Sequence, residues 1–518
     1  MKIILFRCDS SNIIGSGHVS RCRNLARGLK NQGARIIFVC RDHNLNLIEK
    51  LKKEFKVLVI TDDLLNTCFD FKNTFSKRNL FQLKDSEATF KLILKEDLLN
   101  IKWVIVDHYE LGKEWEISIK ENLKNHKKLK LMAIDDLRSR NHEVDILLDQ
   151  NYYNFNDISI LNWQGKRKNL IGCNYCLLSE EYALLHNRIP NRQILSRILI
   201  FFGGADPHNI LCGVIDILKK DSFKKFNFDI VIGGQAEYFE RVKTMVADNP
   251  NFKIHINLPS LSNLMIRSDA AIGAAGSSAW ERACLNLPSI VFTFGFDQEV
   301  ASKSFHEDGY NILIGDKNKV NFQNIFNSIE KLSNSIGSIK TGYNLVDGKG
   351  VGRVSLAIMG PKLPILLKDA KEHDLDLFWR WANDILERNN SNKISFIDYQ
   401  DYKKYFLECL KDKNITKMIA LDSNQRELGQ VSFDLNDINN HAMIDLYIDS
   451  AARSFGISSK VIELGLKKME KKLGRKIITK AKVLKSNIKG INCFTNAGFE
   501  IENDSLDIDK NFIRLRFF

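Results

Sequence analysis

The chain has 518 residues, 44% of them hydrophobic and 27% charged, which is the composition of an ordinary globular protein with room for three or four domains. Lysine and arginine (76) outnumber aspartate and glutamate (63), but the basic residues are spread along polar helix faces, without a basic tail or an aromatic-interleaved block. This distribution argues against nucleic acid and membrane surfaces as partners and leaves anionic small substrates.

Targeting signals and metal sites are not expected. The N-terminal apolar run meets Arg7 and Asp9 at once, which is too early for a signal peptide, and no segment approaches the roughly 18 apolar residues of a membrane span. Ten cysteines occur singly except for Cys173 and Cys176, and neither a second ligand pair nor an HExxH pair accompanies that CxxC. We therefore expect a cytoplasmic protein with reduced thiols and no metal.

Short β-branched runs alternate with amphipathic helical patterns from the N-terminus, as in the βα units of a parallel sheet. Strands are predicted at 2–8, 34–40, 56–60, 102–107 and 129–136, with helices at 17–32 and 45–53. After a polar stretch the pattern restarts, with strands beginning near residues 196, 228, 252, 268 and 289, and it closes with a loop and helix at 347–359. We predict two doubly wound Rossmann-like domains, 1–185 and 186–360, with a ligand-enclosing cleft between them.

The pattern changes after Gly360 and Pro361. A strand at 362–370 precedes helices at 375–389 and 398–412, a β pair at 415–422 and 427–435, and a strand at 443–449 that leads into a helix at 456–472. This order of elements predicts a separate α+β domain over residues 361–518.

One histidine stands where the first strand runs through a Gly/Ser loop into the first helix. In an open α/β sheet, ligands bind beyond the carboxyl ends of the strands, and helix N-termini attract anions. An imidazole at His18 can act there as a general base near neutral pH. The alternative is that Gly15, Ser16 and Gly17 only form a tight turn and His18 caps the helix.

Two glycine-rich loops follow strands of the second domain. Gly203 and Gly204 let backbone N–H groups approach an oxyanion, although a lone Gly-Gly pair is weak evidence. The loop at 273–281 is stronger, because amides at 276–278 can bind a diphosphate while Glu281 accepts hydrogen bonds from ribose hydroxyls. The alternative is a helix cap by Ser277 or Ser278, with Glu281 completing a capping box.

These residues carry a resemblance that covers residues 1–359. The chain resembles the UDP-sugar hydrolase family of pseudaminic acid biosynthesis, which is related to the GT-B glycosyltransferases. The similar blocks run in family order: 7–26, 106–112, 134–151, 172–182, 201–207, 273–292 and 347–354. The resemblance implies a GT-B-like pair of domains that hydrolyses UDP-2,4-diacetamido-2,4,6-trideoxy-β-L-altropyranose to UDP and the free sugar, without a metal.

The resemblance also implies roles for individual residues. His18 matches the family's catalytic histidine and would be the general base. Asp107, His108 and Tyr109 would contact the sugar or support His18. The residues expected to bind UDP or the substrate are Gly17, Asp107, His108, Tyr109, Gly203, Gly204, Gly276, Ser277, Ser278, Glu281 and Gln298. The family commonly has Glu-Asn-Gln where this chain has residues 296–298 as Phe-Asp-Gln, so Gln298 is the better supported of the three.

The last domain resembles the GNAT N-acetyltransferases over residues 362–518. An Arg-x-x-Gly-x-small turn formed by Arg453, Gly456 and Ser458 would present amides to the pyrophosphate of acetyl-CoA. In isolation this pattern fits a capped helix equally well. Asn487 would contact CoA, or would be a polar residue inside a helix. Many GNAT enzymes carry a serine and a proton-donating tyrosine where this chain has Gly490 and Phe494, so no catalytic acid is assigned.

Together the two resemblances predict a bifunctional enzyme that N-acetylates a UDP-4-amino-sugar with acetyl-CoA and then hydrolyses the UDP-linked diacetamido sugar. Two alternatives stay open. The first part of the chain would pass the sugar to an acceptor other than water, as a GT-B glycosyltransferase does. The GNAT-like domain would be a binding module without catalysis.

Overall fold

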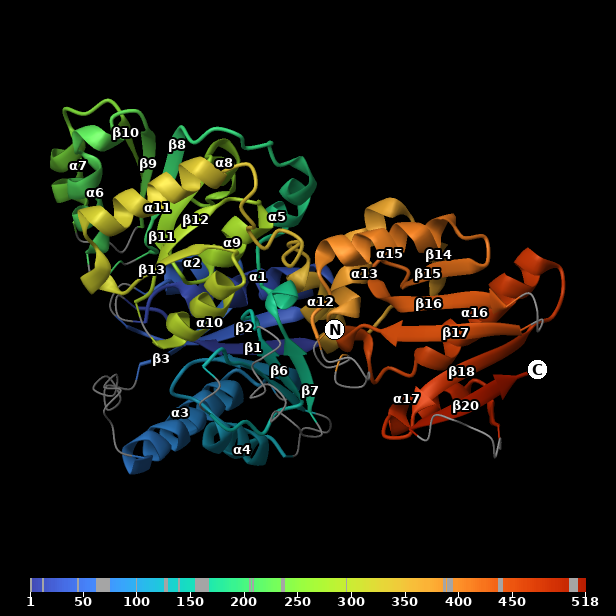
Figure 1. Ribbon diagram of the computed structural model, residues 1–518. Helices are drawn as coiled ribbons and strands as arrows, with labels where there is room; N and C mark the ends of the chain where they lie inside the picture. Colours follow the sequence, from blue (N-terminus) through green and yellow to red (C-terminus); the bar gives the residue numbers. More distant parts are fainter. Residues whose placement is uncertain are drawn as a thin grey trace. The chain divides into compact units, whose positions relative to one another are not determined.

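The computed structural model describes residues 2–11, 14–43, 46–61, 75–98, 100–124, 129–137, 140–153, 167–204, 206, 209–233, 238–294, 296–384, 388, 395–436, 441–502 and 511–518. The chain forms two compact units. The described residues up to 351 make up unit 1, which contains two parallel sheets, and those from 352 onward make up unit 2, which contains one mixed sheet (Figure 1).

The first sheet of unit 1 is parallel throughout, in the order β3-β2-β1-β4-β5-β6-β7. Its central strands are almost wholly buried, as expected when helices cover both faces. The strands are β1 (Ile3–Cys8), β2 (Arg35–Arg41), β3 (Lys56–Ile60), β4 (Ile101–Asp107), β5 (Lys130–Ile134), β6 (Ile146–Asp149) and β7 (Lys168–Ile171). The helices are α1 (Gly17–Asn31), α2 (Ile48–Lys52), α3 (Phe75–Lys95) and α4 (Lys113–Asn122).

The second sheet of unit 1 is also parallel, in the order β10-β9-β8-β11-β12-β13, around its own apolar core. Its strands are β8 (Arg197–Phe201), β9 (Asn227–Ile232), β10 (Phe252–Ile256), β11 (Ala270–Ala274), β12 (Ser289–Phe292) and β13 (Ile312–Gly315). The next helices are α5 (Glu180–Leu185), α6 (Ile210–Leu218), α7 (Phe239–Val246), α8 (Ser262–Arg267), α9 (Ser278–Cys284), α10 (Phe296–Glu307) and α11 (Phe322–Ser335). Helix α12 (Gly350–Met359) begins at the end of unit 1 and continues into unit 2.

The sheet of unit 2 has the order β14-β15-β16-β17-β18-β20-β19 and is antiparallel except for the β17–β18 pair. The strands are β14 (Leu366–Asp369), β15 (Ile415–Leu421), β16 (Glu427–Asn436), β17 (His441–Ile448), β18 (Ile478–Leu484), β19 (Glu500–Ile501) and β20 (Phe512–Phe517). The helices are α13 (Leu375–Ala382), α15 (Tyr399–Lys411), α16 (Ser458–Leu473) and α17 (Ile488–Asn496). Short 3-10 turns lie at Cys173–Tyr175, His186–Arg188, Asp221–Phe223, Lys317–Lys319, Glu372–Asp374 and Ser450–Ala452.

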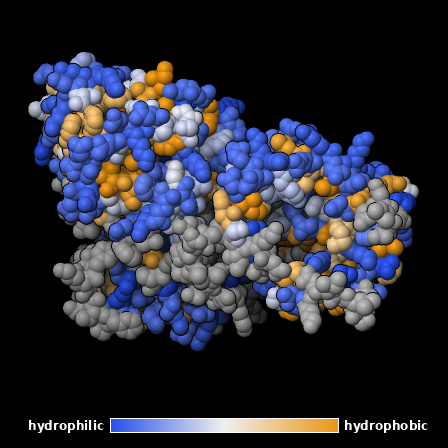
Figure 2. All heavy atoms as spheres, in the orientation of Figure 1, coloured by the Kyte–Doolittle hydropathy of each residue, from blue (hydrophilic) through white to orange (hydrophobic). Residues whose placement is uncertain are grey.

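The predicted fold class is confirmed: two Rossmann-like parallel sheets in a GT-B-like pair are followed by an α+β domain with GNAT-like strand order. The strand predicted from residue 289 ends at Phe292, and Phe296 begins α10. Strands β6, β7, β13, β18, β19 and β20 were not predicted. For β6, β7, β13 and β19 the reason is that runs of two to four residues give too little periodicity. Hydrophilic residues predominate on the face in Figure 2, and no helix in the described ranges is long and apolar enough to cross a bilayer.

Candidate active site

His18 is held by a buried carboxylate. It is the second residue of α1, and Asp107 ends the neighbouring strand β4. The imidazole Nδ1 lies 2.6 Å from Asp107 Oδ1. Burial alone would raise the pKa of Asp107, but the nearby charges of Arg21 and His18 hold it well below its usual value, so the group is a carboxylate. Asp107 therefore accepts from Nδ1–H and leaves Nε2 of His18 as the proton acceptor.

Arg21 fixes the Asp107 carboxylate from the other side. Its Nε donates to Oδ2 at 2.6 Å and its Nη2 to Oδ1 at 2.7 Å, while Nη1 donates to Oδ2 of Asp136 at 2.6 Å. The paired hydrogen bonds of a guanidinium with a carboxylate restrict both distance and orientation. The sequence reasoning did not find Arg21 or Asp136. The signal was an arginine one turn after His18 on an otherwise apolar helix face.

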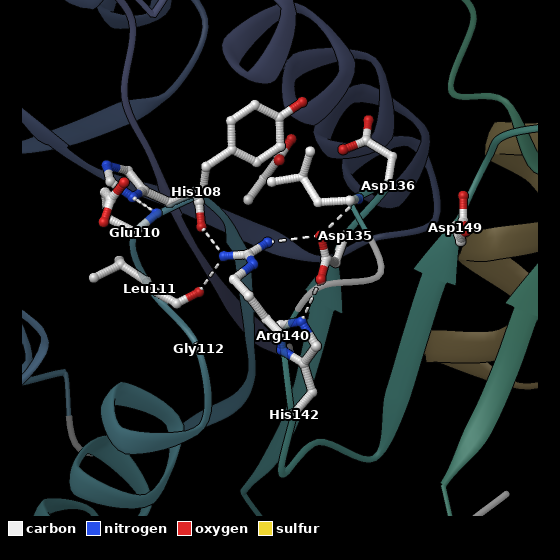
Figure 3. Close-up of polar contacts among 12 residues, drawn as sticks. His108, Glu110, Leu111, Gly112, Asp135, Asp136, Arg140, His142 and Asp149 are labelled. Carbon is white, nitrogen blue, oxygen red and sulfur yellow. Dashed lines mark hydrogen bonds and ion pairs between the residues drawn. The ribbon is translucent and has the colours of Figure 1, made fainter. Parts of the chain in front are cut away.

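Tyr109 packs edge-on against His18, with ring centroids 4.5 Å apart. The guanidinium of Arg140 lies 5.9 Å from the centre of the Tyr109 ring. Figure 3 shows how Arg140 is fixed: Nη1 donates to the carbonyl oxygens of His108 and Leu111, both at 2.7 Å, and Nη2 pairs with Asp135 at 2.8 Å. One arginine thus holds the loop that carries Tyr109.

A second buried histidine completes this support (Figure 3). His142 lies between two carboxylates, with Nδ1 2.6 Å from Glu116 Oε1 and Nε2 2.8 Å from Asp135 Oδ2. Burial would lower the pKa of His142, but hydrogen bonds to Asp135 and Glu116 raise it above its usual value. An imidazolium donating to both carboxylates ties α4 to the end of β5.

His108 belongs to a different cluster from His18. Its Nε2 lies 3.3 Å from Asp9, its Nδ1 accepts from the backbone N–H of Glu110, and Arg7 pairs with the same Asp9. The residue is buried, and burial lowers its pKa. The structure therefore places His108 in the polar interior beside the sheet, and its predicted contact with the sugar stays a prediction.

The predicted UDP-binding residues of the second sheet lie at the carboxyl ends of adjacent strands. Gly203 and Gly204 follow β8, and Gly203 has a φ of +95°. Gly276 and the two serines follow β11, which pairs with β8. Gln298 in α10 accepts from the N–H of Phe294 at 3.2 Å, and a methyl group on Gly276 would lie 3.8 Å from its Nε2. The structure thus brings Gly276 and Gln298 together.

Neither helix-capping alternative is realised at these loops. Ser16 and Ser277 occupy the N-cap positions of α1 and α9, and neither side chain makes a capping hydrogen bond. His18 lies inside α1 and uses Nδ1 on Asp107. Glu281 is hydrogen-bonded to Tyr182, and burial raises the pKa of its carboxyl group to about 7. The serine side chains at the ends of both loops therefore do not cap the helices that follow.

In unit 2, the predicted acetyl-CoA residues follow β17. Gly456 has a φ of +71°, and Ser458 begins α16. The Arg453 side chain turns back, with Nε donating to the carbonyl oxygen of Ile448 at 2.8 Å. Beside this turn, β17 and β18 pair only from His441 to Met443, although β17 continues to Ile448. The two strands therefore part toward the turn.

Asn487 occupies a helix end rather than a helix interior. Its side chain caps α17 by accepting from the N–H of Gly490 at 2.9 Å, which corrects the expectation of a helix-interior residue as the alternative to CoA contact. Phe494 is buried against Phe499, with ring centroids 5.1 Å apart.

Comparisons with known proteins give distant relatives. No protein-family model matches the chain. It is 23% identical to the uncharacterized protein MJ1062 of Methanocaldococcus jannaschii, over 96% of this chain and 97% of that protein. It is also 23% identical to the UDP-2,4-diacetamido-2,4,6-trideoxy-beta-L-altropyranose hydrolase of Campylobacter jejuni, over 60% of this chain and 98% of the hydrolase. The chain is distantly similar to a UDP-sugar hydrolase.

A further relative and two solved structures match parts of the chain. The spore coat polysaccharide biosynthesis protein SpsG of Bacillus subtilis is 25% identical, over 37% of this chain and 58% of that protein. Acinetobacter baumannii MurG matches 69% of this chain and 99% of its own at 12% identity and a TM-score of 0.46. Spermidine N-acetyltransferase from Vibrio cholerae matches 30% of this chain and 94% of its own, at 15% identity and a TM-score of 0.27.

Proposed function

We propose that unit 1 hydrolyses a UDP-linked 2,4-diacetamido-2,4,6-trideoxy sugar and that unit 2 acetylates its 4-amino precursor with acetyl-CoA. The single observation that carries the hydrolase is the His18–Asp107 pair, fixed by Arg21 at the end of the sheet. Similarity to the Campylobacter hydrolase over nearly its whole length supports the substrate.

In the proposed reaction, Nε2 of His18 takes a proton from a water molecule whose oxygen attacks the anomeric carbon. The bond from that carbon to the β-phosphate oxygen breaks, and UDP leaves with the electron pair. Asp107 keeps the imidazole in the tautomer that accepts at Nε2 and stabilises the charge that the ring gains. Gly203, Gly204 and the residues 276–278 hold the diphosphate, while Glu281 and Gln298 bind the rest of UDP.

The acetyltransferase proposal rests on the parting of β17 and β18 and on the turn at Gly456. Where the two parallel strands separate, the ladder between them ends, and an extended thioester substrate can lie along β17 there. The turn before α16 would receive its pyrophosphate. Phe494 cannot donate a proton, and Gly490 stands where many GNAT enzymes have a serine; these two residues favour a binding module without catalysis.

Product analysis on the intact chain tests the hydrolase. With the UDP-linked diacetamido sugar and no acceptor, we expect release of UDP and free sugar, and a loss of about 10²- to 10⁴-fold for His18→Ala, the usual contribution of a general base. Release of UDP only after an acceptor is added would support a glycosyltransferase instead. Undiminished release by His18→Ala would remove His18 from the mechanism.

Thiol release tests unit 2 separately. The intact chain with acetyl-CoA and the UDP-4-amino-sugar should produce free CoA, and the His18→Ala protein should produce it at the same rate. No CoA from any of several amino-sugar substrates would favour the binding module.

A further inference from the structure

Arg282 is a buried cation whose side chain lies against the loop between β11 and α9. Only 2% of the residue is exposed. Its Nη1 donates to Ser278 Oγ at 3.0 Å, and its Nη2 donates to the carbonyl oxygen of Ala274 at 2.8 Å. Nε is buried and has no hydrogen-bond partner in the described ranges. The guanidinium thus joins the first and last residues of the loop at 274–278.

The residues that the structure describes offer the positive charge of Arg282 little compensation. Among the residues that the structure describes, no ion pair joins the guanidinium to a carboxylate, and Glu281 acts on it only as a nearby charge. Glu281 is a weak counter-ion, because burial raises its pKa to about 7. Burial lowers the pKa of Arg282 to about 10, which still leaves it charged at neutral pH. Buried charges without a partner are costly, so an anion is expected to complete this site.

The loop at 274–278, against which the Arg282 side chain lies, is suited to binding an anion. Because Ser278 Oγ accepts from the guanidinium, its own proton is available for a second acceptor. The side chains at 274–278 are all small, so backbone N–H groups can approach a ligand closely. A side chain on Gly273 would collide with the carbonyl group of Phe201 and approach Arg282 Nη1 to 3.3 Å, which shows how tightly the guanidinium is packed.

Arg192 provides the contrast of a structural buried arginine in the same sheet domain. Its Nε, Nη1 and Nη2 donate to the carbonyl oxygens of Ser268, Leu285, Asn286 and Met265. Each of its three nitrogens therefore has an acceptor, and its charge lies at the carboxyl end of α8, where the helix dipole is negative. Arg282 has two acceptors and a buried Nε without one.

We propose that Arg282 positions the loop at 274–278 for a nucleoside diphosphate and supplies the positive charge that the phosphate groups neutralise. The inference rests on the proposed UDP-sugar site and adds the residue that provides its charge. When the sugar–oxygen bond breaks, the electron pair stays on the diphosphate, so the same charge also favours departure of UDP.

Calorimetric titration of the intact chain with UDP and with uridine tests this inference, because the two ligands differ only in the diphosphate. Arg282→Met should weaken UDP binding about 10- to 100-fold, the range for hydrogen bonds to charged groups, and leave uridine binding nearly unchanged. Arg282→Lys, which keeps the charge, should retain much of the preference for UDP. Arg192→Met is the matched control: it should lower thermal stability but not the ratio of the two affinities.

Equal weakening of UDP and uridine by Arg282→Met, or no weakening, would overturn the role of Arg282 while leaving the UDP site in place. A wild-type chain that binds no UDP would overturn the proposed function and this inference together. Thermal melting of each variant, read alongside, identifies any loss of affinity that comes from unfolding.

Discussion

Among the individual residues of the site, Asp107 supports His18 in the proposed reaction and does not contact the sugar. It is fully buried, and both of its oxygens are occupied by His18 and Arg21. Its function in the proposed reaction is therefore to orient the imidazole. Asp107 and Arg21 therefore act through His18, the proposed general base.

The substitution Asp107→Asn tests whether Asp107 orients the imidazole of His18. An amide can present its N–H to His18 and so stabilise the tautomer with the proton on Nε2, which cannot accept a proton from water. We expect kcat for UDP release to fall about 10²- to 10⁴-fold with little change in KM. Asp136→Asn is the control, because it loosens Arg21 without touching His18 and should cost much less. A large rise in KM with unchanged kcat would instead assign Asp107 to substrate binding.

At the scale of elements, His142 joins α4 to the end of β5 through two carboxylates. Its pKa is raised in the folded chain, so its stabilising contribution is complete below the unfolded value of about 6.5 and disappears as the pH rises through the folded value. The pKa of Asp135 is lowered in the folded chain, so its stabilising contribution is lost at low pH, as the carboxylate is protonated.

We therefore expect the free energy of unfolding of the wild type to decrease above about pH 6.5. His142→Gln should be less stable at pH 6 by about 3 kcal/mol, the lower range for breaking a buried pair, and should lack this decrease. Denaturant unfolding at pH 6 and pH 8.5 measures both. His373→Gln, at an exposed histidine, is the control and should follow the wild type. The same pH dependence in both variants would contradict the bridging role.

At the scale of the whole molecule, the two compact units allow the two proposed activities to be separated. Gly456→Val places a β-branched residue at a φ of +71°, which strains the turn before α16. We expect the rate of acetyl transfer to fall at least about tenfold, because displacing groups that position a substrate lowers the rate by this much or more. UDP release from the diacetamido sugar should be unchanged. Parallel loss of both activities would show that the units do not act independently.

The periodicity of apolar residues determined the fold class, because buried parallel strands and amphipathic helices leave patterns that a single sequence shows. Glycine-rich turns likewise marked the loop before His18 and the loop after β11. Short strands such as β13 were missed, and the orientation of His108 was not foreseen. A side chain at a strand end can face either side of the sheet, and only its partners decide which.

Residue types and their local spacing show which side chains can do chemistry, whereas folding brings together those that act as one site. Arg21 lies 86 positions from Asp107 and 115 from Asp136, so no local pattern could pair them. That no described carboxylate forms an ion pair with Arg282 is likewise visible only after folding, since it depends on burial and on which side chains come near. Local patterns follow from short-range periodicity, whereas electrostatic balance is a property of the packed interior.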